Sequence, residues 1–141
     1  MVGWLLALSA WDIRERRLPN ALTLPGAVVV LCGALACGRG LPALAGAAGL
    51  ALSYLLVHLS TPAGMGAGDV KLALGIGALT GAFGVDAWVL AALGAPALTA
   101  SLALVSRARA PLPHGPSMCV AAVVAVALVL GRTYGWPCPT T

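Results

Sequence analysis

Two aspartates are the residues of this sequence whose type and setting could do chemistry. The chain holds four acidic residues among 141, and Asp69 stands in a glycine-rich segment between two long apolar runs. Asp12 follows another apolar run and opens the most charged segment of the chain, 12–20. A carboxylate at the edge of a membrane is costly to keep there, so it is a functional hypothesis by default. Two carboxylates that share one site cannot both ionise cheaply, and such a pair can hydrolyse a peptide bond by activating water.

Each aspartate also has a simpler interpretation. Asp69 could cap the helix that follows it, since Asp is a favoured N-cap residue. Asp12 could be a solvated member of a charged loop, offset by the arginines beside it. The other two acids, Glu15 and Asp86, have no comparable setting: basic residues flank Glu15, and Asp86 falls on the opposite side of the membrane in the topology derived below.

The composition predicts an all-α, polytopic integral membrane protein. Hydrophobic residues make up 60 % and charged residues 9 % of the chain, and the mean hydropathy is +0.99. A soluble domain carries about 25 % charged residues, so this chain cannot cover a water-facing surface. Its basic residues flank apolar runs, which indicates topology determinants and not nucleic-acid binding.

The cysteines predict neither a metal site nor a cofactor. They stand at positions 32, 37, 119 and 138 and form no CxxC pair, so zinc-ligand spacing is absent. Those at 32, 37 and 119 lie in apolar runs, where we expect them to behave as small hydrophobic residues. A thiol protease built on Cys119 and His114 is an alternative, but an apolar setting raises the pKa of a thiol and does not activate it.

Six apolar segments could cross the membrane, and the first is short. Val2–Trp11 has ten residues, whereas a span needs about 20; the helix either continues through Asp12 or, as we prefer, begins upstream of Met1. The expected later spans cover residues 21–37, 41–60, 70–84, 87–106 and 117–131.

Glycine and proline mark the details of these spans. Gly77 and Gly81 have the GxxxG spacing that packs membrane helices closely. We expect Pro96 to interrupt the fifth span and Val85–Asp86 to form the turn before it. Gly66 and Gly68 should let the backbone approach another group or adopt a positive φ beside the aspartate.

Basic residues orient the chain. One set of loops holds six of them and the other set two, so the first set should face the cytoplasm. The six are Arg14, Arg16, Arg17, Lys71, Arg107 and Arg109, and the two are Arg39 and Arg132. This orientation predicts a multi-pass protein of the inner (plasma) membrane with both chain ends outside. It brings Asp12, Asp69 and the turn 113–116 to one cytoplasmic face.

Three motifs on that face resemble those of the type IV prepilin leader peptidase family. The first, D-x4-R-x-P-N, is carried by Asp12, Arg17, Pro19 and Asn20. The second, GxGD-x-K, is carried by Gly66, Gly68, Asp69 and Lys71. The third, P-x-G-P, is carried by Pro113, Gly115 and Pro116, although an aromatic residue is more usual where His114 stands. The resemblance covers the chain from Asp12 to about Met118.

The resemblance implies a membrane aspartic endopeptidase, a hydrolase in which Asp12 and Asp69 occupy the two catalytic positions and no cofactor is used. It would remove the short basic leader of prepilin-like or pseudopilin proteins at the cytoplasmic face, commonly after a glycine. Its partners would be that substrate and the lipid bilayer, with no nucleic acid. We expect Arg17 and Lys71 to face lipid headgroups and fix the depth of the aspartates.

Larger members of this family add an N-terminal region with paired CxxC motifs, linked to zinc and N-methylation. No such region is visible in residues 1–141, so the sequence is similar to the compact members that serve Flp/Tad-type pili, and we expect one membrane-embedded peptidase domain.

Other functional classes use similar sequences. An ion-coupled transporter would also hold aspartates in the membrane, but near its midplane and in broken helices. A non-catalytic assembly subunit of a pilus or secretion machine would share the hydropathy without needing two aspartates. A presenilin-like protease also carries GxGD, but its first aspartate lies in an apolar helix and not in a basic segment.

Overall fold

The structure of the chain, a computed structural model, describes residues 3, 5, 10–12, 14, 20–61, 66–106 and 114–133. Its helices are α2 (Asn20–Ala36), α3 (Gly40–Ser60), α4 (Ala67–Phe83), α5 (Val85–Ser106) and α6 (Gly115–Thr133). The described residues before α2 are helical as well. The predicted all-α class is therefore confirmed, and the five later spans lie within three residues of the helices observed.

Three of the helices are long and apolar enough to cross a membrane. They are α3, α5 (over Val85–Val105) and α6 (over Gly115–Arg132), and α2 contributes a shorter apolar stretch, Thr23–Ala36. Exposed leucines and valines are spread over these helices. The chain is a polytopic membrane protein whose apolar outer surface suits a lipid environment.

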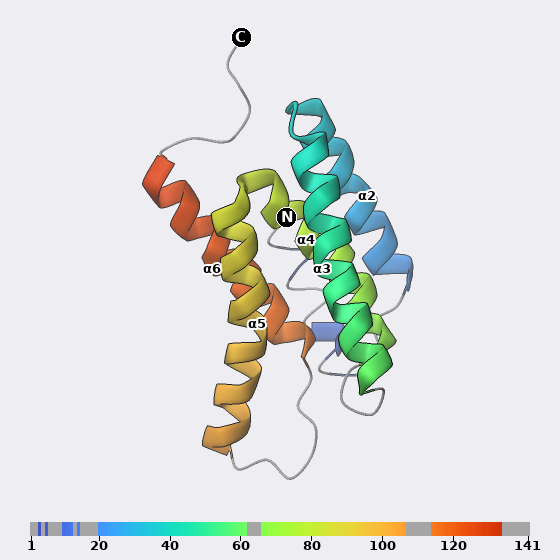
Figure 1. The fold of residues 1–141 in the computed structure, drawn as a ribbon, viewed down its shortest axis with the longest axis vertical. Coiled ribbons are helices and arrows are strands. Elements are labelled where there is room, and N and C mark those ends of the chain that lie inside the picture. The colour runs from blue at the N-terminus through green and yellow to red at the C-terminus, as the bar shows by residue number, and fades with distance from the viewer. Residues whose placement is uncertain are drawn as a thin grey trace.

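Helix α4 is the centre of the bundle. It packs against α2, α3, α5 and α6 (Figure 1). From Leu72 to Ala82 every residue of α4 except Leu74 is buried. A helix surrounded on all sides needs no polar face. The first turn of α4, which carries Asp69, is thus fixed by the whole bundle.

Close contact between α3 and α4 depends on glycines, as the GxxxG spacing predicts. A Cβ on Gly77 would overlap the carbonyl oxygen of Gly46, and one on Gly81 would lie 2.6 Å from the Pro42 oxygen. The prediction of a close-packed crossing at Gly77 and Gly81 is confirmed.

Two predictions about α5 are wrong. Pro96 lies inside a continuous helix, since membrane helices tolerate proline where neighbouring helices and Ser/Thr side chains support the backbone. The turn before α5 is made by Gly84 alone, with φ +116°, and Val85 and Asp86 already belong to the helix. A positive φ reverses the chain in one residue, which glycine allows at no steric cost.

Cys37 also differs from expectation. It follows α2 and is disulfide-bonded, so it is not the small hydrophobic residue predicted; its partner lies outside the described residues. Cys32 and Cys119 form no disulfide. A disulfide depends on which segments meet in the folded chain, and this leaves no local pattern in the sequence.

Candidate active site

Two carboxylates from distant parts of the sequence are buried at the same place. Asp12 is 7 % exposed and Asp69 is 8 % exposed, and the charge of Asp12 acts on the Asp69 carboxyl. Asp12 lies on a helical segment and not in a loop, so its interpretation as a solvated loop residue is wrong.

Asp12 is held by the first residue of α6. The backbone N–H of Gly115 donates a hydrogen bond of 3.1 Å to Asp12 Oδ2 in a buried setting. The first N–H groups of a helix have no partner within it and carry a partial positive charge, so they suit a carboxylate. A Cβ at position 115 would lie 2.5 Å from the same Oδ2 atom. The glycine of the P-x-G-P motif is thus needed where the carboxylate meets the backbone.

Asp69 is held by the first turn of its own helix. The N–H of Gly66 donates to Asp69 Oδ2 at 3.3 Å, and the N–H of Asp69 donates to the Gly66 oxygen at 3.0 Å. Asp69 therefore helps to close the N-terminus of α4 from the third helical position, whereas the N-cap position proposed for it is held by Gly66. Asp69 is buried at the same time.

The expected positive φ beside Asp69 is wrong. Gly66 is extended with φ −75°, and Gly68 lies in α4. A Cβ at Gly66 would make only an ordinary contact, 3.6 Å from Asp69 Oδ2. Gly66 serves the site as a backbone donor, and this geometry does not require a glycine-specific conformation.

The pKa values of the two carboxyls respond to different surroundings. Asp69 lies ahead of the apolar stretch that begins at Val70, and its pKa is raised to about 6 by burial and by the charge of Asp12, while Gly66 and His58 oppose the shift. The pKa of Asp12 is also raised by burial and is lowered by the Gly115 hydrogen bond. Below about pH 6 the pair can therefore hold one proton on Asp69, the state in which one carboxyl can act as an acid and the other as a base.

A second polar cluster, His114 with Tyr54 and Thr99, adjoins the aspartates. The Thr99 hydroxyl donates its one proton to the Ala95 oxygen at 3.1 Å, so it accepts from His114 Nδ1 at 2.7 Å. The other ring nitrogen, Nε2, then accepts from the Tyr54 hydroxyl at 3.2 Å. Burial lowers the pKa of His114, which agrees with this neutral tautomer.

This cluster ties three helices to the site. Tyr54 comes from α3, Thr99 from α5, and His114 immediately precedes the glycine that binds Asp12. Tyr54 also lies close enough to Asp69 for the two to interact electrostatically. Sequence reasoning missed Tyr54 and Thr99; the available signal was a polar side chain inside an apolar helix, which is often functional.

The same cluster bears on the thiol alternative. Cys119 is 3 % exposed, and both ring nitrogens of His114 already have hydroxyl partners. The imidazole is therefore committed to Tyr54 and Thr99 and is not arranged to activate a thiol.

Two of the remaining predicted residues lie at the start of a helix, and a third lies within α4. Asn20 is the first residue of α2, and Pro116 is the second of α6, a position where a missing N–H is harmless. Lys71 is half-buried, one turn into α4. Arg17, Pro19 and Pro113 lie outside the described residues. Within the described ranges no three His, Cys, Asp or Glu side chains could together hold a metal ion.

The chain matches the type IV leader peptidase family over residues 1–135. It is similar to a protein of Xanthomonas campestris pv. campestris described as a prepilin leader peptidase/N-methyltransferase, with 32 % identity over 129 residues. The match covers 84 % of this chain and 45 % of that relative, so the chain spans about half of the relative's length. No solved structure matches the chain. A family match across almost all of the sequence, enclosing both buried aspartates, shows that the chain belongs to the type IV leader peptidase family.

Proposed function

We propose that the protein is an aspartic endopeptidase that removes the short basic leader of prepilin-like or pseudopilin proteins at the cytoplasmic face of the inner membrane. The observation that carries the proposal is the meeting of Asp12 and Asp69, buried together at the start of α4 and α6. The description of the Xanthomonas relative as a prepilin leader peptidase supports the choice of substrate.

The proposed reaction uses water and the two carboxyls. Asp12, whose ionised form the Gly115 N–H favours, takes a proton from water as the water oxygen attacks the scissile carbonyl carbon. Protonated Asp69 gives its proton to the carbonyl oxygen. Collapse of the tetrahedral intermediate breaks the C–N bond, and the leaving amine takes the proton held by Asp12. One hydroxyl of the intermediate returns its proton to Asp69 as the new carboxyl group forms, which restores the starting pair. General acid–base transfer of this kind contributes about 10²–10⁴-fold to a rate.

The alternatives receive less support from the site. A coupling aspartate of a transporter would lie near the bilayer midplane, whereas Asp69 belongs to the first turn of α4. An assembly subunit without activity would have no need for two buried carboxyls, which are costly to desolvate.

Cleavage of a defined substrate tests the proposal. The full chain in proteoliposomes is mixed with a small protein that has a basic leader ending in glycine, followed by one apolar helix. Mass spectrometry should show a new amino terminus directly after that glycine. A matched substrate with valine in place of this glycine should remain intact. If the glycine substrate also stays intact at an equimolar ratio of the two proteins, the proposed activity is wrong.

A further inference from the structure

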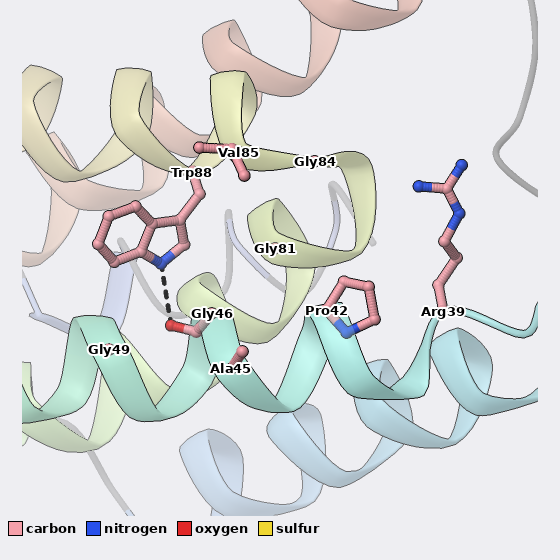
Figure 2. A pocket seen from close by; sticks show the side chains of 9 residues that line it. All are labelled: Arg39, Pro42, Ala45, Gly46, Gly49, Gly81, Gly84, Val85 and Trp88. Atoms are coloured by element: carbon pink, nitrogen blue, oxygen red, sulfur yellow. Dashed lines mark hydrogen bonds between the residues drawn. The ribbon is translucent and has the colours of Figure 1, made fainter.

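A cavity lies at the end of the bundle opposite the aspartates. Its volume is about 490 Å³, and it is bounded by α3, the Gly84 turn and the start of α5 (Figure 2). The lining residues are Arg39, Pro42, Ala45, Gly46, Gly49, Gly81, Gly84, Val85 and Trp88. This volume falls in the range of about 300–1,000 Å³ typical of small-molecule sites.

The walls of this cavity are almost wholly apolar. Glycines provide much of the surface, and the indole of Trp88 closes one end (Figure 2). The one polar atom of Trp88, Nε1, is already used, because it donates to the Gly46 oxygen at 2.9 Å. Arg39 is the only charged side chain of the lining, and it stands at the end of the cavity away from Trp88 (Figure 2).

The position of the cavity relates it to one leaflet of the bilayer. Arg39 lies between two apolar helices, α2 and α3, at the boundary where the membrane-spanning part of α3 begins. From Arg39 to Gly49 the cavity follows ten residues of α3, which is about 15 Å at about 1.5 Å per residue. The hydrocarbon core of a bilayer is about 30 Å thick, so the cavity extends through about one leaflet.

We propose that this cavity binds one membrane phospholipid, with an acyl chain against the glycine and tryptophan wall and the phosphate on Arg39. A cation at the interface with an apolar channel one leaflet deep matches the two ends of such a molecule. An arginine guanidinium suits a phosphate because it offers several N–H donors in a plane. The site is separate from the aspartates, so the proposal does not depend on the peptidase activity.

Native mass spectrometry of the full chain, purified in detergent with added phosphatidylglycerol, tests the proposal. The parent should retain one lipid. Ala45→Trp should abolish retention, because position 45 lines the cavity and is exposed, so the indole can fill it without entering the core. Ala48→Trp is the matched control, since Ala48 is exposed on the same helix and is not part of the lining; this variant should retain the lipid.

The charge is tested separately. Arg39→Gln should weaken phosphatidylglycerol retention about fivefold, as loss of one interfacial cation implies, and Arg39→Lys should largely restore it. Arg132→Gln, at the exposed end of α6, should leave it unchanged. Diacylglycerol, which lacks the phosphate, should bind the parent and Arg39→Gln equally weakly.

Three results would overturn the proposal. The first is equal lipid retention by the parent and Ala45→Trp. The second is equal affinity of the parent for phosphatidylglycerol and diacylglycerol, which would remove the role of the phosphate. The third is a dimer that Ala45→Trp dissociates while lipid retention is unchanged, which would make the cavity an interface between copies of the chain.

If Ala45→Trp does not fold, a phospholipid with a photoreactive acyl chain should crosslink the parent at Val85 or Trp88, and crosslinking elsewhere would count against the site.

Discussion

At the scale of single residues, the backbone N–H of Gly115 positions the Asp12 carboxylate. The Gly115 N–H donates to the carboxylate, and a Cβ at this position would lie 2.5 Å from Asp12 Oδ2, so any side chain here would displace the carboxylate. Glycines in sequence motifs are often explained by backbone flexibility, but Gly115 is explained by its close approach to the Asp12 carboxylate. Gly66, three residues before the other aspartate, contributes backbone hydrogen bonds with Asp69, and a Cβ there would make only an ordinary contact.

Gly115→Ala should therefore impair catalysis strongly. The added Cβ would lie 2.5 Å from Asp12 Oδ2, so the carboxylate must move, and a displacement of about 1 Å can lower a rate about 100-fold. Gly131→Ala is the matched control, because it lies on the same helix with nothing within 4 Å of the new Cβ. Leader cleavage in proteoliposomes measures both variants. Equal rates for the two would show that the Gly115 contact does not position Asp12.

The pKa values predict how the rate depends on pH. The proposed reaction needs Asp69 protonated and Asp12 ionised. Because the pKa of Asp69 is about 6, kcat/KM should fall as the pH rises through 6, approaching about tenfold per unit at higher pH. It should fall again at lower pH, where Asp12 takes up a proton. A rate that instead rises between pH 6 and pH 8, as for a thiol or imidazole base, would contradict this assignment.

At the scale of elements, the crossing of α3 and α4 is what places Asp69. Tyr54 and His58, on the last turns of α3, reach the site only because α3 and α4 approach closely at Gly46, Gly77 and Gly81. The backbone atoms at this crossing cannot move aside for a side chain.

Gly77→Ala should destabilise the bundle. Its Cβ would overlap the Gly46 oxygen, and overpacking of this kind costs about 1–3 kcal/mol. In α2, Gly33→Ala places its Cβ in open space and should keep or slightly raise stability, because alanine favours helix. Thermal unfolding in detergent, followed by circular dichroism, compares the two. If both variants melt with the parent, the crossing does not limit stability.

The elements were predictable from the sequence, whereas the contacts between them were less so. Runs of apolar residues closed by Gly and Pro located α2–α6, and motif spacing identified Asp12, Asp69 and Gly115. The sequence did not indicate that Tyr54 and Thr99 would meet at His114, because that depends on how three helices rotate about their axes. The predicted interruption at Pro96 is wrong for the same reason, since support from neighbouring helices is a tertiary property.

At the scale of the whole molecule, the two ends of the bundle differ in chemistry. One end carries the aspartates, and the other carries Cys37 and Arg39. The 21 residues of α3 separate them, about 30 Å at about 1.5 Å per residue. Disulfides persist in oxidising compartments, so the disulfide at Cys37 supports an outside position for that end. The excess of basic residues that the sequence predicts for the loops on the side of the aspartates favours a cytoplasmic position for Asp12 and Asp69.

Cysteine labelling tests this orientation. In a cysteine-free background that still cleaves its substrate, a cysteine at position 39 should react with an impermeant maleimide added outside intact cells. A cysteine at Thr61, which is exposed after α3, should react only once the cytoplasmic face is opened. The reverse pattern would place the aspartates outside and away from a cytoplasmic leader.

The most direct test of the account is the rate of leader removal by aspartate variants. Asp12→Asn and Asp69→Asn should each lower the rate by at least about 10³-fold, and the double variant should be no slower than either, as for groups that act as a unit. Asp86→Asn, which changes an exposed acid in the first turn of α5, and Cys119→Ser should both cut at the parent rate. Cleavage by Asp69→Asn at a rate close to the parent's, together with loss of cleavage in Cys119→Ser, would contradict the aspartate mechanism.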